Sequence, residues 1–585
     1  RIFFDRRDPS QYFFTDPYDF CVQRPEDVIF TNTLSPFTNL TYYKGGGSRD
    51  GEERFKSYFA INANKRLGFG FYIDYLYGRG LYQDQSTAFF NGGLFSSYRG
   101  DKYDMHFIFN NDNLKMAENG GITDDRYITN PLDMAEGKKE YSANEIPTRL
   151  SQIWNHNTSY HAFLTHRYNL GFYKEKQDSV DTDSVKITQV FVPVTSFIHT
   201  LQVDLNNRKY ISYDDAQNQK YFEHNYLGTD SIDKTKRTSI KNTIGIALQE
   251  GFNKWAKAGL TAFLSYEYRN FALTDTTNIP GQRIINNYKE SSLSIGGELS
   301  KKQGKLLHYN ILGELAIAGE DAGQFSVEGR GDLNLRLFGD TVRLDVNAFI
   351  KNQNPVFYFR HFQSKHYWWD NNDLSKIMRT RLEGKLSLDR WGTQLRAGVE
   401  NIKNYTYLAN TSIPVKDSEG NVTGFKNNAA VRQHSGNIQI FTAMLQQKLK
   451  VGIFHLDGEV AYQKSSEQDI LPLPELSAYG NLYMKFGLAK KVLQIEMGAD
   501  VRYFSKYYAP DYSPVIGQFY NQNPDDKIEI GAFPIVNVYA NLHLKRTRFF
   551  IMMYHVNAGS GKSNYFLAPH YPINPRMIKF GLSWN

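Results

Sequence analysis

A sustained alternation of charged and apolar residues between positions 326 and 337 constrains this chain more than any other feature. Every second residue from Ser326 to Arg336 is polar or charged, and the residues between them are valine, leucine or glycine. A period of two is that of a β-strand with one apolar and one charged face. The same alternation returns at 342–348, 378–389 and 394–400. The sequence therefore predicts many two-faced strands.

The length of these runs favours strands that cross a membrane. Strands of soluble proteins usually have ~3–10 residues, whereas a membrane-spanning strand needs ~9–11 tilted residues that face lipid and lumen alternately. Several runs of this chain reach about a dozen residues, at or beyond the upper end of the soluble range. The alternative is a soluble antiparallel sheet with one dry and one wet face. We expect the barrel.

Composition agrees with one large closed sheet. The chain has 585 residues without a linker or a low-complexity segment, and 15% of them are aromatic, which girdles at two membrane interfaces would use. No stretch approaches the ~18 consecutive apolar residues of a transmembrane helix. The net charge of +7 is mild and no basic patch carries stacking aromatics, so nucleic acid is not an expected partner. The single cysteine, Cys21, excludes an internal disulfide framework.

The connections between the predicted strands alternate between turns of a few residues and long segments such as 112–155, 206–238 and 352–376. Bacterial outer-membrane barrels have short periplasmic turns and long extracellular loops. We therefore predict a single large antiparallel transmembrane β-barrel over residues 37–585, with about 22 strands (18–22) and both termini in the periplasm. The connection 174–184 is longer than this scheme requires.

Residues 1–36 do not alternate. They are rich in Asp, Arg, Pro and Phe, and Asp8-Pro9 and Asp16-Pro17 are turn signals. We interpret them as a non-strand segment on the periplasmic side. It either tucks into the lumen or packs on the surface.

Two short motifs carry a resemblance to a known family. They are Gly120-Gly121-Ile122-Thr123-Asp124-Asp125 and Ala568-Pro569-His570-Tyr571-Pro572. Together they resemble the putative porins of Bacteroidota outer membranes, and the likeness extends from about residue 35 to the end of the chain. The resemblance implies a barrel in the outer membrane of a Gram-negative bacterium.

The inner face of the predicted barrel carries charges of both signs. These side chains either pair across strands and stiffen the wall, or form rows of like charge whose field orients polar solutes. The two interpretations are compatible. The lumen-lining candidates are Glu328, Arg330, Asp332, Arg336, Arg343, Asp345, Arg379, Arg381, Glu383, Lys385, Arg396, Glu400, Glu496, Asp500 and Arg502.

Other candidate chemistry is sparse. No Ser-His-Asp constellation can be recognised, so we do not expect an enzyme, and no cofactor is implied. Asp370 and Asp373 belong to an oxygen-rich stretch that could bind calcium, but the spacing is not that of an EF-hand. A solvated extracellular loop is the favoured interpretation of that stretch.

The leading functional prediction is a porin-like channel for passive diffusion of small polar solutes. The alternative is a non-conducting barrel that serves as a subunit of an outer-membrane complex for protein assembly, secretion or lipoprotein export. Outer-membrane lipids are the expected surroundings in both cases. Other barrels or surface lipoproteins are the expected partners in the second case.

Overall fold

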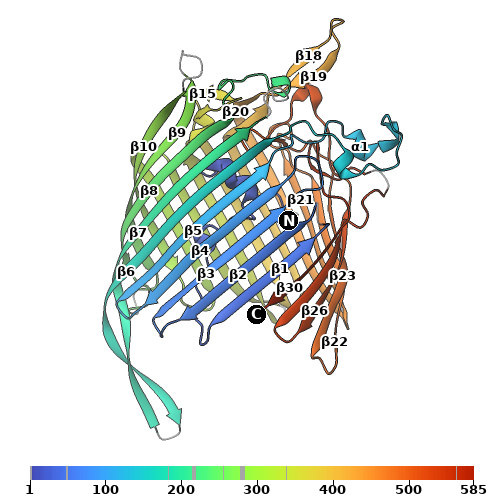
Figure 1. Cartoon of the computed structure of the whole chain (residues 1–585). Helices are drawn as coiled ribbons and strands as arrows, with labels where there is room; N and C mark the ends of the chain where they lie inside the picture. Colours follow the sequence, from blue (N-terminus) through green and yellow to red (C-terminus); the bar gives the residue numbers. More distant parts are fainter. Residues whose placement is uncertain are drawn as a thin grey trace.

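The alternating segments fold into the 22 strands of a closed antiparallel β-barrel in a computed structural model (Figure 1). The structure describes residues 3–47, 50–181, 184–213, 219–253, 256–276, 283–337, 339–560 and 563–585. Each strand pairs with the next one along the chain, and the last strand pairs with the first. The predicted fold class is confirmed, with the strand number at the predicted value of about 22.

The barrel strands are β1 (Phe37–Gly45), β2 (Glu52–Asn62), β3 (Leu67–Gly78), β4 (Thr87–Arg99), β5 (Tyr103–Ala117), β6 (Ile153–Asp181), β7 (Ser184–Ser212), β8 (Ile232–Leu248), β9 (Gly259–Thr276), β10 (Arg283–Lys301), β11 (Leu307–Gly319), β12 (Phe325–Leu337), β13 (Asp340–Gln353), β16 (Ile377–Leu388), β17 (Thr393–Asn410), β20 (Ala429–Val451), β21 (Phe454–Ser465), β22 (Leu476–Leu488), β23 (Leu493–Phe504), β26 (Ile535–Leu544), β27 (Thr547–Tyr554) and β30 (Met577–Trp584).

Shorter elements belong to the N-terminal segment and the connections and are not part of the barrel wall. They are the strands β14 (His361–Gln363), β15 (Trp368–Asp370), β18 (Ile413–Lys416), β19 (Val422–Lys426), β24 (Asp511–Ser513), β25 (Gln518–Tyr520), β28 (Phe566–Ala568) and β29 (Tyr571–Pro572), the helices α1 (Arg126–Thr129) and α3 (Phe357–Arg360), and 3₁₀ turns at Phe13–Tyr18, Pro25–Asp27, Pro131–Asp133, Ala143–Glu145, Asp389–Trp391 and Pro524–Asp526.

Closure of the sheet follows from the membrane environment. β1 pairs with β30 from Leu40 opposite Trp584 to Gly45 opposite Lys579. An open sheet edge in lipid would leave unpaired backbone groups that cost several kcal/mol each. The outward-facing residues of the alternation, such as Leu382 and Val399, are 54% and 53% exposed on the isolated barrel, which is the surface that lipid covers.

The two ends of the barrel differ. One end, at the top of Figure 1, carries the connections 118–152, 213–231, 354–376, 411–428, 505–534 and 555–576, and we call it the long-loop end. The other end carries short connections such as 302–306 and 389–392, and we call it the short-turn end. The long connections are shorter than predicted at 112–155 and 206–238, because β5 to β8 continue further than their alternation indicated.

The connection predicted at 174–184 is wrong. β6 and β7 each have 29 residues and pair as a hairpin that continues well beyond the short-turn end (Figure 1). The tip at 182–183 lies outside the described residues. The sequence from Lys174 to Ser179 is mostly polar on both faces, so the alternation disappears while backbone pairing continues. A ribbon surrounded by water has no lipid-facing side, and its sequence carries no membrane signature.

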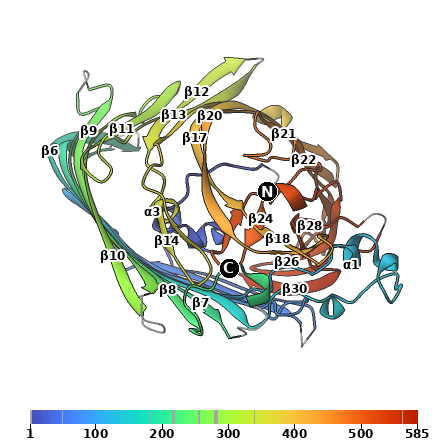
Figure 2. The same ribbon diagram turned by 90° about the horizontal axis from the view of Figure 1, so that it is seen from above.

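Residues 3–36, here called the N-terminal strap, lie inside the barrel, and Figure 2 shows the N-terminus within the ring of strands. From the start of β1 the strap follows the inner wall of β2 to β5, where Tyr58 donates to the Ile29 carbonyl at 3.0 Å and Asn110 to the Gln23 carbonyl at 2.8 Å. It then crosses the lumen. Near its beginning, the Phe4 N–H donates to Gln463 of β21 at 2.8 Å.

Candidate functional site

The charged residues predicted to line the lumen lie on one face of neighbouring strands. Arg381 of β16 is directly opposite Glu400 of β17, and Lys385 of β16 is directly opposite Asp345 of β13. In a strand, residues two apart share a face. The pairing register therefore brings these side chains together on the inner wall, and their neighbours in the sequence point outward.

Glu400 is the centre of a buried ion-pair cluster on this wall. Its Oε1 lies 2.5 Å from Nη2 of Arg379, and its Oε2 lies 2.9 Å from Nη2 of Arg381. A third guanidinium, that of Arg6 in the strap, donates from Nε to Oε2 at 2.8 Å. The Glu400 side chain is 1% exposed. Because a buried charge without partners is costly, the strap and the wall stabilise each other here.

Two acidic residues of the strap balance the surplus of arginines. Asp8 forms an ion pair with Arg379, and Asp5 lies 3.2 Å from Nη1 of Arg381. Lys351 of β13 links the strap to Glu328, another of the predicted lumen-lining residues. Its Nζ lies 3.5 Å from Asp8 and 2.6 Å from Glu328. Charges expected to face an open lumen are thus neutralised by the strap.

The middle of the strap contributes to an aromatic core inside the barrel. Phe13 and Phe14 are 1% and 0% exposed. The ring of Phe14 lies 4.7 Å from that of Tyr358, which belongs to the connection 354–376. In the same connection, Phe357 stacks on Phe271 of β9 at 3.9 Å. The cluster extends to the connection 505–534, so the strap and two inward-folded loops share one hydrophobic core in the long-loop half of the lumen.

A buried polar network joins this core to the wall. Tyr512 and Asn155 donate to Oε1 of Glu118 at 2.9 and 2.7 Å, and Tyr512 also hydrogen-bonds the strap residue Tyr18. Arg208, which is fully buried, donates to Oδ1 of Asn155 at 2.9 Å. Burial raises the pKa of Glu118 to about 8, so the carboxyl group holds its proton at neutral pH. Sequence reasoning missed these residues, although Glu118 lies two positions before one of the two family-like motifs.

The short-turn half of the lumen is different. A polar cavity of about 410 Å³ is lined there by Arg330, Asp332, Arg343, Asp345 and Lys385, all of them predicted lumen residues. Asp345 lies 3.0 Å from Nζ of Lys385, and the side chain of Arg343 is 52% exposed. Lys301, Lys302 and His308 add to the basic side of this lining. The charges here face solvent instead of protein.

The remaining predicted residues, apart from Arg336, have partners of their own along the inner wall. Arg396 lies 2.6 Å from Glu383, Lys485 lies 3.6 Å from Glu496, Asn537 donates to Asp500 at 2.9 Å, Arg502 lies over the Tyr479 ring at 5.7 Å, and Arg336 is exposed near the turn after β12. Cross-strand pairing therefore accounts for many of the charges, as the simpler interpretation predicted.

A family model described as "Putative porin" matches residues 1–585. The chain belongs to this family of putative porins. No curated protein sequence matches it.

Solved structures with the same fold as this porin-family chain include siderophore receptors and a copper transporter. The siderophore receptor PirA from Acinetobacter baumannii has 9% identity and a TM-score of 0.61, with 95% of this chain and 81% of that chain covered. The ferric enterobactin receptor PfeA from Pseudomonas aeruginosa has 12% identity and a TM-score of 0.60, with 95% and 82% covered. The copper transporter OprC has 9% identity and a TM-score of 0.59, with 95% and 81% covered.

At such identities these likenesses show the fold alone. With the family match, they identify the chain as an outer-membrane β-barrel, so the outer-membrane part of the predicted location is confirmed. The direction in which the two ends face stays a prediction.

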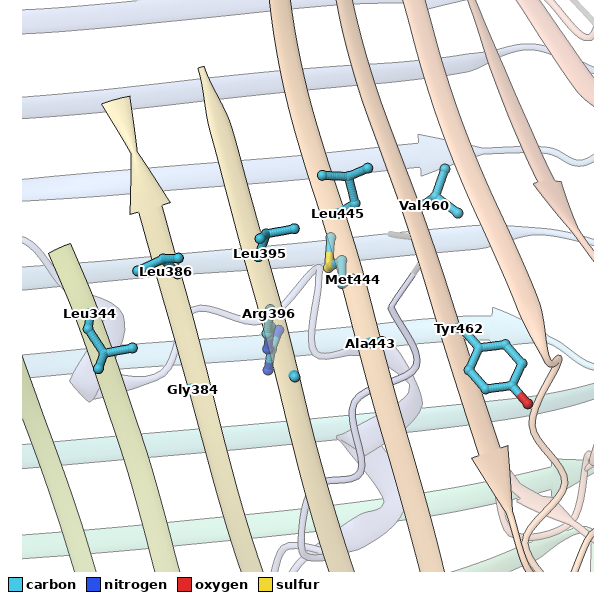
Figure 3. A pocket seen from close by; sticks show the side chains of 11 residues that line it. Leu344, Gly384, Leu386, Leu395, Arg396, Ala443, Met444, Leu445, Val460 and Tyr462 are labelled. Carbon is cyan, nitrogen blue, oxygen red and sulfur yellow. The ribbon is translucent and has the colours of Figure 1, made fainter. Parts of the chain in front are cut away.

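An apolar hollow of about 560 Å³ lies on the outer face of this porin-family barrel (Figure 3). Leu344, Leu386, Leu395 and Leu445 form a row across four strands. The hollow exists because the adjoining row carries Gly384, Ala397 and Ala443. These residues alternate with the lumen-facing charges, so the hollow faces lipid and is no part of a path through the lumen.

The weak calcium candidates gain no support from their surroundings. Asp370 accepts a hydrogen bond from Nδ1 of His361 at 2.7 Å, within the small β14–β15 hairpin. In the described part of the chain, no group of three or more His, Cys, Asp or Glu side chains is placed to hold a metal ion. The same residues contain no helix that is long and apolar enough to cross a membrane.

Proposed function

We propose that this barrel is a gated outer-membrane channel for small polar solutes, closed in the state described here by the N-terminal strap and the inward-folded loops. The observation that carries the proposal is the attachment of the strap. Its covalent link to the wall is at β1, and across the lumen it is held through Arg6, Asp8 and the aromatic pair Phe13 and Phe14. Such contacts can open while every strand pair of the wall stays intact.

The charged, solvent-exposed short-turn half supports a path for polar solutes. Rings of charged side chains set selectivity in channels, and a wide lumen excludes little by size alone. Once the strap leaves, the wall charges that it neutralises, among them Arg379 and Arg381, join those of the short-turn half. The open channel would then have a lining rich in arginine, which favours anionic or dipolar solutes.

The test is conductance in planar bilayers of the full-length protein and of a chain that lacks residues 1–20. We expect rare, brief openings for the full-length protein and frequent stepwise conductance for the shortened one. A full-length variant, Arg379→Ser with Arg381→Ser, loses the ion-pair partners of the strap and should also open more often. Lys485→Ser is the matched control, because Lys485 pairs with Glu496 away from the strap.

Heat-modifiable migration on a gel confirms that each variant is a folded, inserted barrel. If both strap variants are inserted but electrically silent, the gated channel is wrong.

A second candidate is a non-conducting subunit of an envelope complex. Two observations favour it: the filled long-loop half of the lumen and the β6–β7 hairpin that extends past the barrel. A two-stranded ribbon is at best marginally stable alone in water, so a partner protein would stabilise this one. Silent strap variants together with a partner that co-purifies in constant stoichiometry would favour this second function.

A further inference from the structure

We propose that a cavity at the long-loop end binds a neutral, hydroxyl-rich solute of the size of a mono- or disaccharide. The cavity has a volume of about 440 Å³ and is here called the mouth cavity. Its lining comes from the connections 118–152, 213–231, 411–428, 505–534 and 555–576, with Asn410 from the end of β17. Its volume lies in the ~300–1,000 Å³ range of small-molecule sites.

The floor of the mouth cavity is held in place by its own hydrogen bonds. Asn427 is 5% exposed, donates to the Tyr520 hydroxyl at 2.9 Å and accepts from the Tyr367 hydroxyl. Beside it, Asn523 donates to the Ser412 carbonyl at 2.9 Å. Loops fixed in this way form a site that exists before a ligand arrives, which lowers the entropic cost of binding.

Asp511 gives this floor an acceptor for a ligand. It is 9% exposed and lines the cavity, and within the described residues it accepts one hydrogen bond, from the Tyr512 N–H to Oδ1 at 2.7 Å. Burial raises the pKa of Asp511 to about 6, so the group is ionised at neutral pH. Its Oδ2 can therefore accept a hydrogen bond from a hydroxyl group of a solute in the cavity.

The charges of the lining argue against an ionic ligand. Arg149 and Lys220 are balanced by Asp511 and Asp526, and His570 lies 3.1 Å from Asp125. No sign of charge dominates, and the lining also carries the neutral polar side chains of Asn410, Ser412 and Gln522. A hydroxyl group both donates and accepts, so a solute with several hydroxyls satisfies such a lining at more points than an ion of either sign.

Two aromatic side chains complete the lining. Tyr221 and Phe425 come from different connections and are half-buried, whereas Thr123 and Lys220 at the rim are exposed. Ligand sites combine apolar and aromatic walls with a few polar groups that fix orientation. The C–H faces of a sugar ring would meet the aromatic side chains while its hydroxyls reach Asp511.

The role of the mouth cavity as the first binding step of transport rests on the proposed channel function. The binding of a sugar in the cavity does not depend on that function. Saturation-transfer NMR on the detergent-solubilised protein tests it with two probe pools. One pool holds neutral sugars (glucose, galactose, mannose, N-acetylglucosamine, maltose, lactose and sucrose), and the other holds free amino acids. We expect saturation transfer to at least one sugar and at least fivefold less in Asp511→Ala and in Phe425→Ala.

Phe425→Ala separates a loss of binding from misfolding of the barrel, because Phe425 is on the β18–β19 hairpin, which is not part of the barrel wall. Glu419→Gln, at the exposed tip of the same hairpin, should keep the full signal. No transfer to the sugars, transfer to amino acids alone, or transfer that survives both variants would each overturn the proposal. If the barrel binds sugars but none of its variants conducts in bilayers, the channel proposal is wrong and the binding-site proposal stands. If the barrel conducts but binds no sugar, the binding-site proposal is wrong and the channel proposal stands.

Discussion

The two halves of the lumen use the same wall in different ways. In the long-loop half, lumen-facing charges are buried against the strap, and the Glu400 side chain is 1% exposed. In the short-turn half, the same kind of strand places Arg343 in solvent at 52% exposure. The alternation of the sequence is alike in both halves, so what differs is the protein that fills the lumen.

This difference separates the energetics of the two halves. A buried charge that loses its partner costs ~3–5 kcal/mol, whereas an exposed ion pair contributes ~0–1 kcal/mol. Residues of equal charge on equal strands should therefore have unequal importance. Five experiments test the contrast.

The largest expected effect is all-or-none and concerns which half faces the outside. A tag inserted at Asn421, in the turn of the β18–β19 hairpin, should be labelled on intact cells. A tag at Gly304, in the turn between β10 and β11, should be labelled only after permeabilisation. Labelling of Gly304 on intact cells would place the filled half toward the periplasm and the mouth cavity with it.

The next effect compares Glu400→Ala with Asp345→Ala. We expect the first to lower the free energy of unfolding by ~3–5 kcal/mol, because three guanidinium groups lose their common partner. The second should cost less than ~1 kcal/mol, since its partners are partly exposed. Urea unfolding in liposomes measures both.

Cys21 supplies an independent measurement of strap docking. It is the single cysteine of the chain and lies in the strap, where it is 8% exposed and packs against Phe89, Leu114 and Met116 of the wall. Burial also raises the pKa of its thiol to about 11, which suppresses reaction with a maleimide. Glu400→Ala should speed labelling at least tenfold and Asp345→Ala should not. Equal rates would show that the two halves hold the strap alike.

A fourth experiment tests the barrel wall itself, apart from the segments that fill the lumen. Leu382 lies at the middle of β16 and faces outward, so Leu382→Arg should cost ~2–4 kcal/mol. Lys385→Ala, on the inner face of the same strand, should cost less than ~1 kcal/mol, because the Lys385 side chain is 36% exposed. Leu335 would be a poorer site because it is close to the end of β12 at Leu337. Urea unfolding in liposomes again decides, and equal costs would contradict the assignment of the two faces.

The last effect, which is the smallest for a change of one pH unit, is on the pH dependence of stability. The pKa of Glu118 is raised from 4.5 to about 8 by burial, so the folded chain keeps a proton that the unfolded chain has already released in this range. Stability should fall as pH rises through this window, by at most ~1.4 kcal/mol per pH unit, and level off above it. Glu118→Gln should remove that slope. The same slope in the variant would assign it to another group.

The barrel wall could be predicted because a period of two is a local property of the sequence. The run at 326–337 coincides with β12, which the structure places at Phe325–Leu337. Prediction failed where no face meets lipid, as in the outer part of the β6–β7 hairpin, and where short strands such as β24 lie inside a connection. In those places the pattern depends on contacts with water or with distant segments.

The contents of the lumen could not be predicted for a related reason. Asp8 and Arg379 are 371 positions apart, and nothing near either residue marks the other as its partner. Both interpretations of the inner-face charges, cross-strand pairs and a field across the lumen, considered the wall alone. The strap supplies a third arrangement, in which the wall charges pair with a segment that crosses the barrel.

The length of chain between the strap and its partners also dictates the order in which the barrel is assembled. The strap precedes every barrel strand in the sequence, and its contact Tyr512 lies 494 residues after Tyr18. The strap therefore stays undocked through most of synthesis, and contacts of such separation form slowly. Since β1 directly follows the strap and pairs with β30, the last strand of the barrel, the ring must close around a strap that is already inside it, or the strap must enter the ring after it has closed.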